Sequence, residues 1–585
     1  MEYAQLVSVY AELESTPKRL AKTRVLADFL REVPVSDVSR VVLLLQGKVF
    51  ASWDDRKVGI ASRLVLKALH TATGVTASTI ENTWKKTGDL GLAAEQLIGK
   101  KKQATLFSSS LSVEKVFSNL QKLASMEGAG TVGRKVQMVA ELLTSATALE
   151  ARYIIRTVLE DLRVGVGEGS LRDAIAWAYF GKELNLSYDA EKNDIVMEDR
   201  EEYVKRVDAV QRAYDLTNDF GVVASEAKKN GMTGLEKLGV TLFKPLKCML
   251  ALKVADVEEG FERCGKPVAV ECKLDGFRMQ IHKDGDSVKL FTRRLDEVTP
   301  AFPDVVKLVQ KHVTAQQVIL DAEAVGFDVA SGKYLPFQSI GQRIRRKYDI
   351  EKMATDYPVE VNVFDLLYHD GETLLSHPYS ERRERLESIV KSEKRKMVVV
   401  PSIVSSSKTE IWRFYKKSLS EGNEGAMFKK LDAPYKPGAR VGHMCKLKDE
   451  QDALDLVIVG AEWGEGKRSK WLSSFTLACS DSGEFVEIGK VGTGVKEKPE
   501  EGLSFGEMTS ELKPLIVSES GKSVVVKPKI VVEIAYEEIQ KSPTYSSGYA
   551  LRFPRVKRLR SMERSASDIT TLAEIEKLYG KQKKS

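Results

Sequence analysis

Hydrophobic residues recur at two different spacings along the chain, and the changes between them mark three stretches. Up to about residue 240 the spacing is helical, as in VQMVAELLTSATALEARYIIRTVLEDL. From about 245 to 450 short alternating strands dominate, with a few helices such as YSERRERLESIVKSEKR. From about 451, segments such as ALDLVIVGAEWG and SVVVKPKIVVEIAYEEI predict a small all-β barrel, and TTLAEIEKLYGKQKKS predicts a final helix with a basic tail.

These three patterns predict a multidomain protein. We expect an all-α N-terminal domain over residues 1–240, an α+β domain over 241–449, and a C-terminal all-β barrel with a closing helix over 450–585. The division agrees with the length, because 585 residues exceed what one hydrophobic core usually serves.

Composition excludes only a few classes of protein. The net charge of +7 permits a polyanionic partner but does not demand one, and a solvated surface rich in Lys and Glu would give the same value. The five cysteines are scattered without a CxxC pair, so a zinc ribbon or a disulfide framework is not expected. The N-terminus has no signal-peptide pattern and no apolar run is long enough to span a membrane, so we expect a cytoplasmic protein that does not contact membranes.

The stretch VAVECKLDGFRMQIH, residues 268–282, predicts two short strands around an Asp-Gly turn. Glu271 and Lys273 share one face of the first strand, and Arg278 lies on the polar face of the second. The Lys-x-Asp-Gly pattern alone is a weak signal, because a hairpin with a surface lysine would also produce it.

Further segments place charged and aromatic residues on strands of the same region. VILDAEAVGFD puts Asp321 and Glu323 on one face of a strand. Any one of these segments could be ordinary structure, since buried acids are often satisfied by a neighbouring cation. The remaining candidates are Arg293 in KLFTRRLDEVT, Phe364 in VNVFDLLYHDG, Glu424 in EGNEGAMFKKLDAPYKPG, and Lys446 and Lys448 in HMCKLKD.

Together these residues form a coherent candidate site that could hold a triphosphate. One lysine can act as the nucleophile, other cations can hold phosphates, two glutamates can bind a hard metal ion, and an aromatic ring can stack on a base. A lysine amine attacks only when neutral, so its usual pKa of about 10.4 must be lowered, and nearby cations favour that change.

The order of these motifs resembles the covalent nucleotidyltransferases, and specifically the ATP-dependent DNA ligases of the archaeal and eukaryotic replicative type. The matching segments are KLDGFR, FTRR, LDAEAV, VFDLLY, EGAMFKK and CKLK. The resemblance implies that Lys273 forms a lysyl-adenylate from ATP, with Mg²⁺, or alternatively Mn²⁺, as the metal. It also implies that the adenylate is sealed into a nick in double-stranded DNA, in replication, repair and recombination.

The resemblance assigns further roles in the α+β domain. Glu271 reads the adenine amino group, and Phe364 stacks on the base. Glu323 and Glu424 serve the ribose and the metal ion. The implied contacts with the sugar and the phosphates are Arg278, Arg293, Arg440, Lys446 and Lys448.

Both ends of the chain extend the resemblance. GAGTVGRKVQMVAELL and the helical segment after it look like the DNA-binding domain of these ligases. Thr131 and nearby glycines at a helix start can present backbone N–H groups to a phosphate, with Arg134 and Lys135 alongside. A glycine-rich helix cap is the structural alternative. The C-terminal barrel, with GKVGTG and LRFPRVKRLR, is similar to the ligase OB domain.

KKKQATLF resembles a short motif that binds the sliding clamp, PCNA, with Gln103, Leu106 and Phe107 in the motif positions. The alternative is a loop whose apolar residues fold back onto the domain. We expect the protein to act as a monomer.

The sequence departs from the family pattern at two places. Met444 replaces a customary tryptophan. The last motif is Arg-x-Asp-Lys in the family, but here the stretch reads RSMERSASD, which leaves Arg560 and Arg564 as candidates to orient pyrophosphate.

Four alternatives are less well supported. An RNA-capping guanylyltransferase would not need about 240 helical residues in front, and an NAD-dependent ligase would carry a zinc module. A catalytically inactive scaffold would not retain the lysines and glutamates of the motifs. A P-loop ATPase would have lysine where Arg134 stands in GAGTVGRK.

Overall fold

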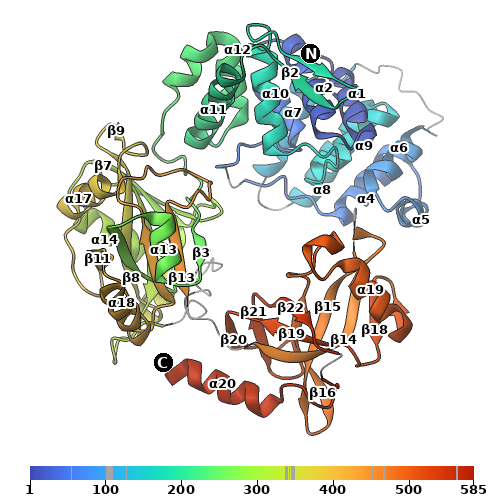
Figure 1. Cartoon of the computed structure of the whole chain (residues 1–585). Coiled ribbons are helices and arrows are strands. Elements are labelled where there is room, and N and C mark those ends of the chain that lie inside the picture. The colour runs from blue at the N-terminus through green and yellow to red at the C-terminus, as the bar shows by residue number, and fades with distance from the viewer. Residues whose placement is uncertain are drawn as a thin grey trace. The chain divides into compact units, whose positions relative to one another are not determined.

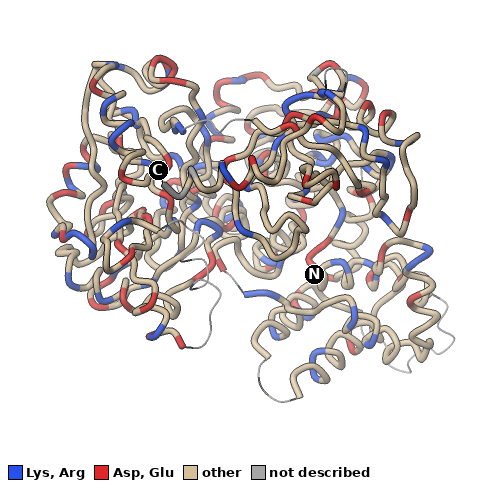
Figure 2. The backbone as a smooth tube through the Cα atoms, turned by 90° about the horizontal axis from the view of Figure 1, so that it is seen from below, with Lys and Arg blue, Asp and Glu red and all other residues tan. Residues whose placement is uncertain are grey.

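A computed structural model describes residues 1–585 except 55, 100–109, 127, 129, 336–339, 341–342, 344–348, 449–452, 465–467, 562–563 and 585. The chain divides into two compact units. The first contains Met1–Ile411 and Met427–Lys446, and the second contains Trp412–Ala426 and Leu447–Ser585. The predicted boundaries at residues 240 and 449 remain predictions. Figure 2 shows basic and acidic positions interleaved along the backbone.

The N-terminal region is helical, as predicted (Figure 1). Its only strands among the described residues are the short pair β1 (Ser187–Asp189) and β2 (Asp194–Val196). The amphipathic faces of the helices bury one shared core. The helices are α1 (Tyr3–Ser15), α2 (Arg19–Glu32), α3 (Val38–Leu45), α4 (Ser62–Thr73), α5 (Ala77–Thr87), α6 (Leu90–Gly99), α7 (Val113–Ala124), α8 (Thr131–Ser145), α9 (Ala148–Val158), α10 (Glu168–Phe180), α11 (Arg200–Thr217) and α12 (Phe220–Lys237).

The α+β region contains two sheets. One has the strand order β10-β8-β7-β5-β6, with β9 beside β8, and the other has the order β11-β4-β12-β13-β3. The strands are β3 (Leu252–Val254), β4 (Val268–Lys273), β5 (Phe277–Asp284), β6 (Ser287–Thr292), β7 (Gln317–Gly326), β8 (Val359–His369), β9 (Glu372–Thr373), β10 (Met397–Val399), β11 (Ser402–Ser405), β12 (Gly425–Lys429) and β13 (Met444–Lys448). The helices are α13 (Val257–Cys264), η1 (Thr299–Ala301), α14 (Pro303–His312), α16 (Ile350–Asp356), α17 (Tyr379–Ile389) and α18 (Lys408–Ser420).

The two strands predicted around the Asp-Gly turn exist, but they do not pair with each other. β4 pairs with β11 in one sheet, whereas β5 pairs with β6 and β7 in the other. The chain therefore crosses between the sheets at residues 274–276. The alternating pattern predicts strands and their faces, but it does not choose their partners.

Both faces of β5 are buried, including the face predicted to be polar. Met279 and Ile281 lie in an apolar core on one side. On the other side, the chain before β3 covers Gln280 and His282: the Leu246 backbone N–H donates to Gln280 Oε1 (2.8 Å), and the Phe243 N–H donates to His282 Nδ1 (2.9 Å). Burial lowers the pKa of His282 to about 3, so the imidazole remains neutral and keeps Nδ1 as an acceptor.

The C-terminal region is rich in β-strands, with helices beside them (Figure 1). β14 pairs with β15, β18 and β19, so the sheet wraps around an apolar core. The elements are β14 (Leu454–Trp463), β15 (Leu472–Asp481), β16 (Glu484–Val491), η3 (Pro499–Glu501), α19 (Phe505–Leu512), η4 (Lys513–Leu515), β17 (Ile516–Ser520), β18 (Ser523–Val526), β19 (Val531–Ala535), β20 (Glu538–Lys541), β21 (Tyr549–Arg552), β22 (Arg555–Leu559) and α20 (Leu572–Lys584).

Candidate active site

Lys273 is the last residue of β4 and is partly exposed where the chain leaves one sheet for the other. The turn that follows packs closely on β7. A Cβ atom at Gly276 would lie 2.6 Å from the Ala324 carbonyl oxygen and 2.9 Å from Cγ of Glu323. Only glycine fits this space, so the Lys-x-Asp-Gly pattern holds the segment after Lys273 against the strand that carries Glu323.

We expect Gly276→Ala to slow, about tenfold or more, the covalent labelling by ATP that the resemblance implies for Lys273. The nearest atom is a strand carbonyl oxygen, which cannot move aside cheaply, so the Lys273 segment must shift instead. Covalent labelling of the protein by ATP measures the rate. The control is Gly239→Ala, because Gly239 is exposed and a Cβ atom added there would have nothing within 4 Å. A labelling rate equal to that of the wild type would show that the close packing is not required.

A buried ion pair fixes Arg278 next to this turn. Its Nη2 donates to Oδ2 of Asp321 (2.7 Å), and the Tyr435 hydroxyl donates to the same oxygen (2.6 Å). Burial disfavours the charge on Arg278, but Asp321 outweighs it and holds the pKa of the guanidinium above its ordinary value. Arg278 is also the direct cross-strand neighbour of Glu323.

The charges of the candidate site act on the buried thiol of Cys248. Burial is the main cause that raises its pKa to about 12. Two of the sequence-predicted arginines lower this pKa and two carboxylates raise it, so all four lie within electrostatic reach of one buried sulfur. The four residues are Arg278, Arg293, Asp321 and Glu323.

Glu271 is buried, and three side chains hold its carboxylate. The Tyr379 hydroxyl and Nη1 of Arg383 (3.1 Å) donate hydrogen bonds to it, and Nζ of Lys429 forms an ion pair with it at 2.8 Å. No pattern in the sequence singles out Tyr379 or Arg383, whereas Lys429 lies in the motif EGAMFKK. A carboxylate has about four acceptor positions, so these donors leave room for one more, such as an amino group. The arrangement therefore fixes the carboxylate firmly without using all of its capacity.

Lys429 connects Glu271 to the predicted base-stacking residue. Its Nζ donates to the Phe364 carbonyl oxygen (2.9 Å) and lies 4.9 Å from the centre of the Phe364 ring. The Arg278 guanidinium lies 5.2 Å from the same ring. Phe364 is partly exposed, so its ring could stack on a purine. The two neighbouring cations help to hold the ring in position.

Glu424 and Lys448 meet in the second unit. Lys448 Nζ lies 2.8 Å from Oε2 of Glu424 and 3.0 Å from Oε2 of Glu537. Burial opposes the charge on Lys448, but the carboxylates raise its pKa. Gly425 permits the close approach, because a Cβ atom there would lie 2.1 Å from the Leu447 carbonyl oxygen. Lys446 lies two residues earlier on β13 and is partly exposed, and Arg440 is exposed in the segment before that strand.

The predicted DNA-binding residues do lie at the start of a helix. Gly130 precedes α8 with a positive φ of 75°. The Thr131 hydroxyl donates to the Gly128 carbonyl oxygen (2.6 Å), and Lys135 Nζ donates to the Val58 carbonyl oxygen (3.3 Å). Arg134 is exposed, and its Nη2 lies 3.5 Å from Oγ1 of Thr131. The structure therefore orders this helix start and leaves an arginine facing solvent there.

Arg560 and Arg564 are held by acidic neighbours in the C-terminal region. Both approach Asp455, at 3.5 Å and 2.9 Å respectively. Arg560 also lies 3.5 Å from Glu533, and Arg564 lies 3.2 Å from Asp568. The predicted clamp-binding residues Gln103, Leu106 and Phe107 fall outside the residues that the structure describes.

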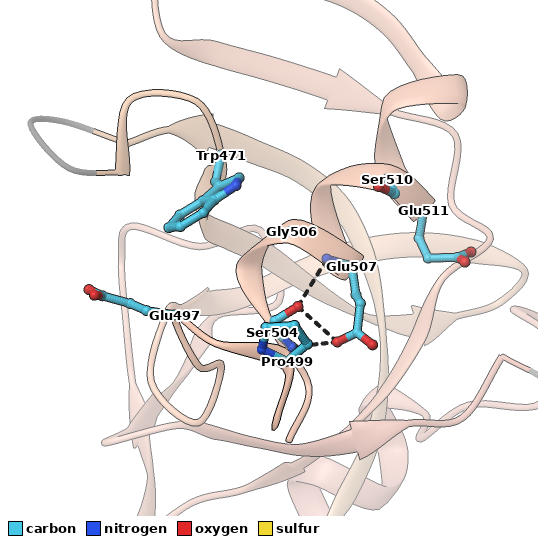
Figure 3. Close-up of a pocket in the computed structure, with 8 residues that line it drawn as sticks. All are labelled: Trp471, Glu497, Pro499, Ser504, Gly506, Glu507, Ser510 and Glu511. Carbon is cyan, nitrogen blue, oxygen red and sulfur yellow. Dashed lines mark hydrogen bonds between the residues drawn. The ribbon is translucent and has the colours of Figure 1, made fainter. Parts of the chain in front are cut away.

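A shallow pocket of the C-terminal region has the wrong charge for a triphosphate. Trp471 forms one side and the start of α19 forms the other (Figure 3). The Ser504 side chain and Glu507 form a reciprocal cap of that helix. Three glutamates contribute to the lining, which consists of Trp471, Glu497, Pro499, Ser504, Gly506, Glu507, Ser510 and Glu511. We therefore do not assign the nucleotide to this pocket.

Comparison with known proteins identifies the family. Residues 248–448 match the ATP dependent DNA ligase domain, residues 2–176 the DNA ligase N terminus, and residues 468–563 the ATP dependent DNA ligase C terminal region. The DNA ligase of Nanoarchaeum equitans (strain Kin4-M) is 44% identical, with 100% of this chain and 99% of that protein covered. The DNA ligase of Archaeoglobus fulgidus is 43% identical over 99% of this chain and 98% of that protein.

A solved structure described as Pmar-Lig_PreS3 has the same fold, with a TM-score of 0.56, 16% identity, and coverage of 95% of this chain and 99% of that one. A helical N-terminal region, an α+β region with the lysine motif and a β-rich C-terminal region together define the architecture of a covalent nucleotidyltransferase that acts on nucleic acid. The chain belongs to the ATP-dependent DNA ligases. The predicted family, fold class and activity are thus confirmed, and ATP and DNA are its substrates. The structure has no helix, among those it describes, with the length and apolar character of a membrane span.

Proposed function

We propose that Lys273 is the residue that carries AMP in this ligase. The observation that supports it is the setting of Lys273 in the sequence and in the fold. It ends β4 two residues after Glu271, whose carboxylate is fixed by three donors, and it precedes Arg278, which is fixed by Asp321. A side chain between two such anchors, of which Glu271 is buried and Arg278 partly buried, can be held in position for attack on a bound nucleotide.

The Lys273 amine attacks the α-phosphorus of ATP. A P–N bond forms, the P–O bond to the β-phosphate breaks, and pyrophosphate leaves. A 5′-phosphate oxygen at a nick then attacks the same phosphorus, and the lysine amine departs. In the last step the 3′-hydroxyl attacks the 5′-phosphorus, AMP leaves, and the strand is sealed.

Other side chains of the proposed site contact the base, the sugar and the phosphates of the nucleotide. Phe364 stacks on adenine, and Glu271 accepts from its amino group. Arg278 and Arg293 contact the sugar and phosphates, and later the nick. Lys446, Lys448 and Arg440 contact phosphates, and for Lys448 the substrate would compete with the carboxylates that now pair with it.

Glu323 and Glu424 supply the kind of oxygen ligands that a divalent cation prefers. Mg²⁺ is usually held by one or two carboxylates together with substrate phosphates, so a complete protein cage is not needed. Among the described residues there is no group of three or more His, Cys, Asp or Glu side chains that could hold a metal ion. Mg²⁺, or Mn²⁺ in its place, would neutralise phosphate charge when bound. The dependence of labelling on added metal ion, compared for Glu323→Gln and Glu424→Gln, tests the two ligands.

Incubation of the full chain with α-phosphate-labelled ATP tests the covalent step. We expect the label to remain on the protein through a denaturing gel, and to transfer to DNA when a nicked duplex is added. ADP, GTP and NAD in place of ATP define the nucleotide specificity. Peptide mapping should place the label on Lys273, and a label on any other residue would refute the assignment.

The helical region grips DNA through phosphates in this proposal. The start of α8, with Thr131, Arg134 and Lys135, would contact one phosphate group without reading sequence. Arg134→Ala should therefore remove about one phosphate contact. The slope of the logarithm of the binding constant for nicked duplex against the logarithm of salt concentration should become shallower by about 1. Unchanged salt dependence in Arg134→Ala would remove this role.

Two further roles rest on the sequence. Gln103, Leu106 and Phe107 bind a sliding clamp, and calorimetry of Phe107→Ala with a clamp tests this role.

Arg560 and Arg564 orient pyrophosphate, for which they must leave Asp455. Their loss should then slow adduct formation from ATP and spare the sealing of a nick supplied already adenylated. Light scattering of the purified chain tests the expected monomer.

A further inference from the structure

Two cysteines far apart in the sequence face each other in the α+β region. Cys264 is the last residue of α13, and Cys445 is the second residue of β13. Their Sγ atoms lie 3.5 Å apart, and the Cys264 thiol donates to the Cys445 sulfur. Both side chains are buried, and the carbonyl oxygens of Gly442 and Phe428 lie 3.6 and 3.8 Å from Cys264 Sγ.

This separation is short enough for the two sulfurs to bond after a small movement. A disulfide bond is about 2.05 Å long, so the sulfurs must approach by roughly 1.5 Å. In the structure the five cysteines are free, and Cys264 and Cys445 are not bonded to each other. Cys479, which is equally buried, donates instead to a backbone carbonyl, that of Val486 (3.7 Å).

The position of Cys445 on its strand connects the pair to the proposed site. Successive side chains of a strand point to opposite faces, so Cys445 faces α13 while Met444 and Lys446 face the other way. Met444 indeed belongs to a different apolar cluster, which it shares with Met249 and Tyr435. The thiol therefore lies on the back of the strand whose front carries a proposed phosphate contact.

Movement of α13 cannot easily close the gap. Gly260 packs so closely on the Phe428 ring that a Cβ atom there would lie 2.7 Å from Cε1. Phe428 is itself fully buried. Because the helix is already in contact with this ring, β13 has to supply much of the approach, and Lys446 would move with it.

We propose that Cys264 and Cys445 form a reversible disulfide bond, and that this bond slows adenylation by displacing β13. The second half rests on the proposed phosphate contact of Lys446. A shift of about 1 Å in a group that positions a substrate can reduce a rate by one to two orders of magnitude. The pair would thus make ligation sensitive to oxidation.

A small disulfide such as glutathione disulfide is a sufficient oxidant. Local opening of the end of β13 gives the oxidant access to the buried pair. The Cys445 thiolate then attacks one sulfur of glutathione disulfide and expels one glutathione thiolate. The Cys264 thiolate then attacks the mixed disulfide at Cys445 and expels the second. Two protons and two electrons leave the protein, and one disulfide is reduced to two thiols. The hydrogen bond from Cys264 lowers the pKa of Cys445, which favours Cys445 as the first nucleophile.

The test compares the full chain before and after oxidation by glutathione disulfide, with thiols blocked before digestion. Trypsin leaves Cys264 and Cys272 on one peptide, so a second cleavage after Glu271 is needed to separate them. Mass spectrometry should show Cys264 joined to Cys445. The initial rate of labelling by ATP should fall about tenfold and recover after treatment with dithiothreitol.

Three serine variants give the controls. Cys264→Ser and Cys445→Ser should each lose the linkage and the effect of the oxidant, whereas Cys479→Ser should keep both. Glutathione on separate thiols without a linkage, a bond to Cys272, or a linkage without a change in rate would each overturn the proposal. The linkage is read by mass alone, so it stays measurable even if the reduced chain fails to label and the assignment of Lys273 is wrong.

Discussion

Lys273→Ala should abolish covalent labelling of this ligase by ATP, a loss of about 10⁴-fold or more if Lys273 is the nucleophile. No neighbouring group can replace the amine, because the other cations proposed around it are committed to phosphates or carboxylates. Lys273→Arg should fail to a similar extent, since a guanidinium stays protonated and cannot attack phosphorus. The measurement is the amount of label on the protein after a denaturing gel.

A surface lysine of the same region provides the control. Lys289 on β6 is paired with Glu297 (3.0 Å), and Lys289→Ala should label at the wild-type rate. Sealing of a nick that is supplied already adenylated needs no attack by Lys273, so both Lys273 variants should retain part of that activity. A labelled adduct in either variant would show that another residue carries AMP.

Arg382→Met should destabilise the fold by about 3–5 kcal/mol. The Arg382 side chain is 1% exposed and forms an ion pair with Asp365, which is 2% exposed, at 2.7 Å. It also donates to the carbonyl oxygens of His377 (2.6 Å) and Ala433 (3.1 Å). Loss of the guanidinium leaves a buried carboxylate without its counter-ion, directly beside Phe364 in the sequence. Thermal and urea unfolding of the full chain measure the effect.

Arg385 on the same helix is the matched control. It is paired with Glu372 and Glu381, but at the surface, so Arg385→Met should change stability by less than about 1 kcal/mol. Equal destabilisation by the two variants would contradict the argument from burial.

The pH dependence supplies a second check on Arg382. Burial alone would raise the pKa of Asp365, but Arg382 holds it below its ordinary value. A carboxyl group with a lowered pKa stabilises the fold above its unfolded pKa of about 3.9, and this contribution is lost as the pH falls through the folded value. In Arg382→Met the ionised Asp365 carboxylate is buried at neutral pH without this counter-ion, which destabilises the fold. The stability gap between the variant and the wild type should therefore narrow towards pH 3.

The sequence was sufficient for the order of the regions and for the residues in the motifs. Alternation placed Asp321 and Glu323 on one face of β7, and the structure keeps them there together with Arg278. The helical spacing around α8 and the pattern YSERRERLESI also predicted helices where they occur. These are local properties, and each depends on residues only a few positions apart.

Contacts between residues far apart in the sequence could not be predicted from such local patterns. The donors to Glu271 come from Tyr379 and Arg383, which lie 108 and 112 positions further along the chain. Lys429 stands inside a motif that was recognised, but nothing in the motif shows that it joins Glu271 to Phe364. Likewise, the spacing of Cys264 and Cys445 carries no sign that the thiols touch.

The crossing of the chain between two sheets also determines when the ligase can become active during its synthesis. β5, β6, β7 and β8 are consecutive, so their sheet can form soon after they leave the ribosome. β4, which carries Lys273, has its partners in β11 and β12, and these emerge more than 120 residues later. Such non-local pairing forms late and slowly. Nascent chains that end before Ser402 should therefore protect β5–β8 from proteolysis, leave β4 open to cleavage, and take up no ATP label.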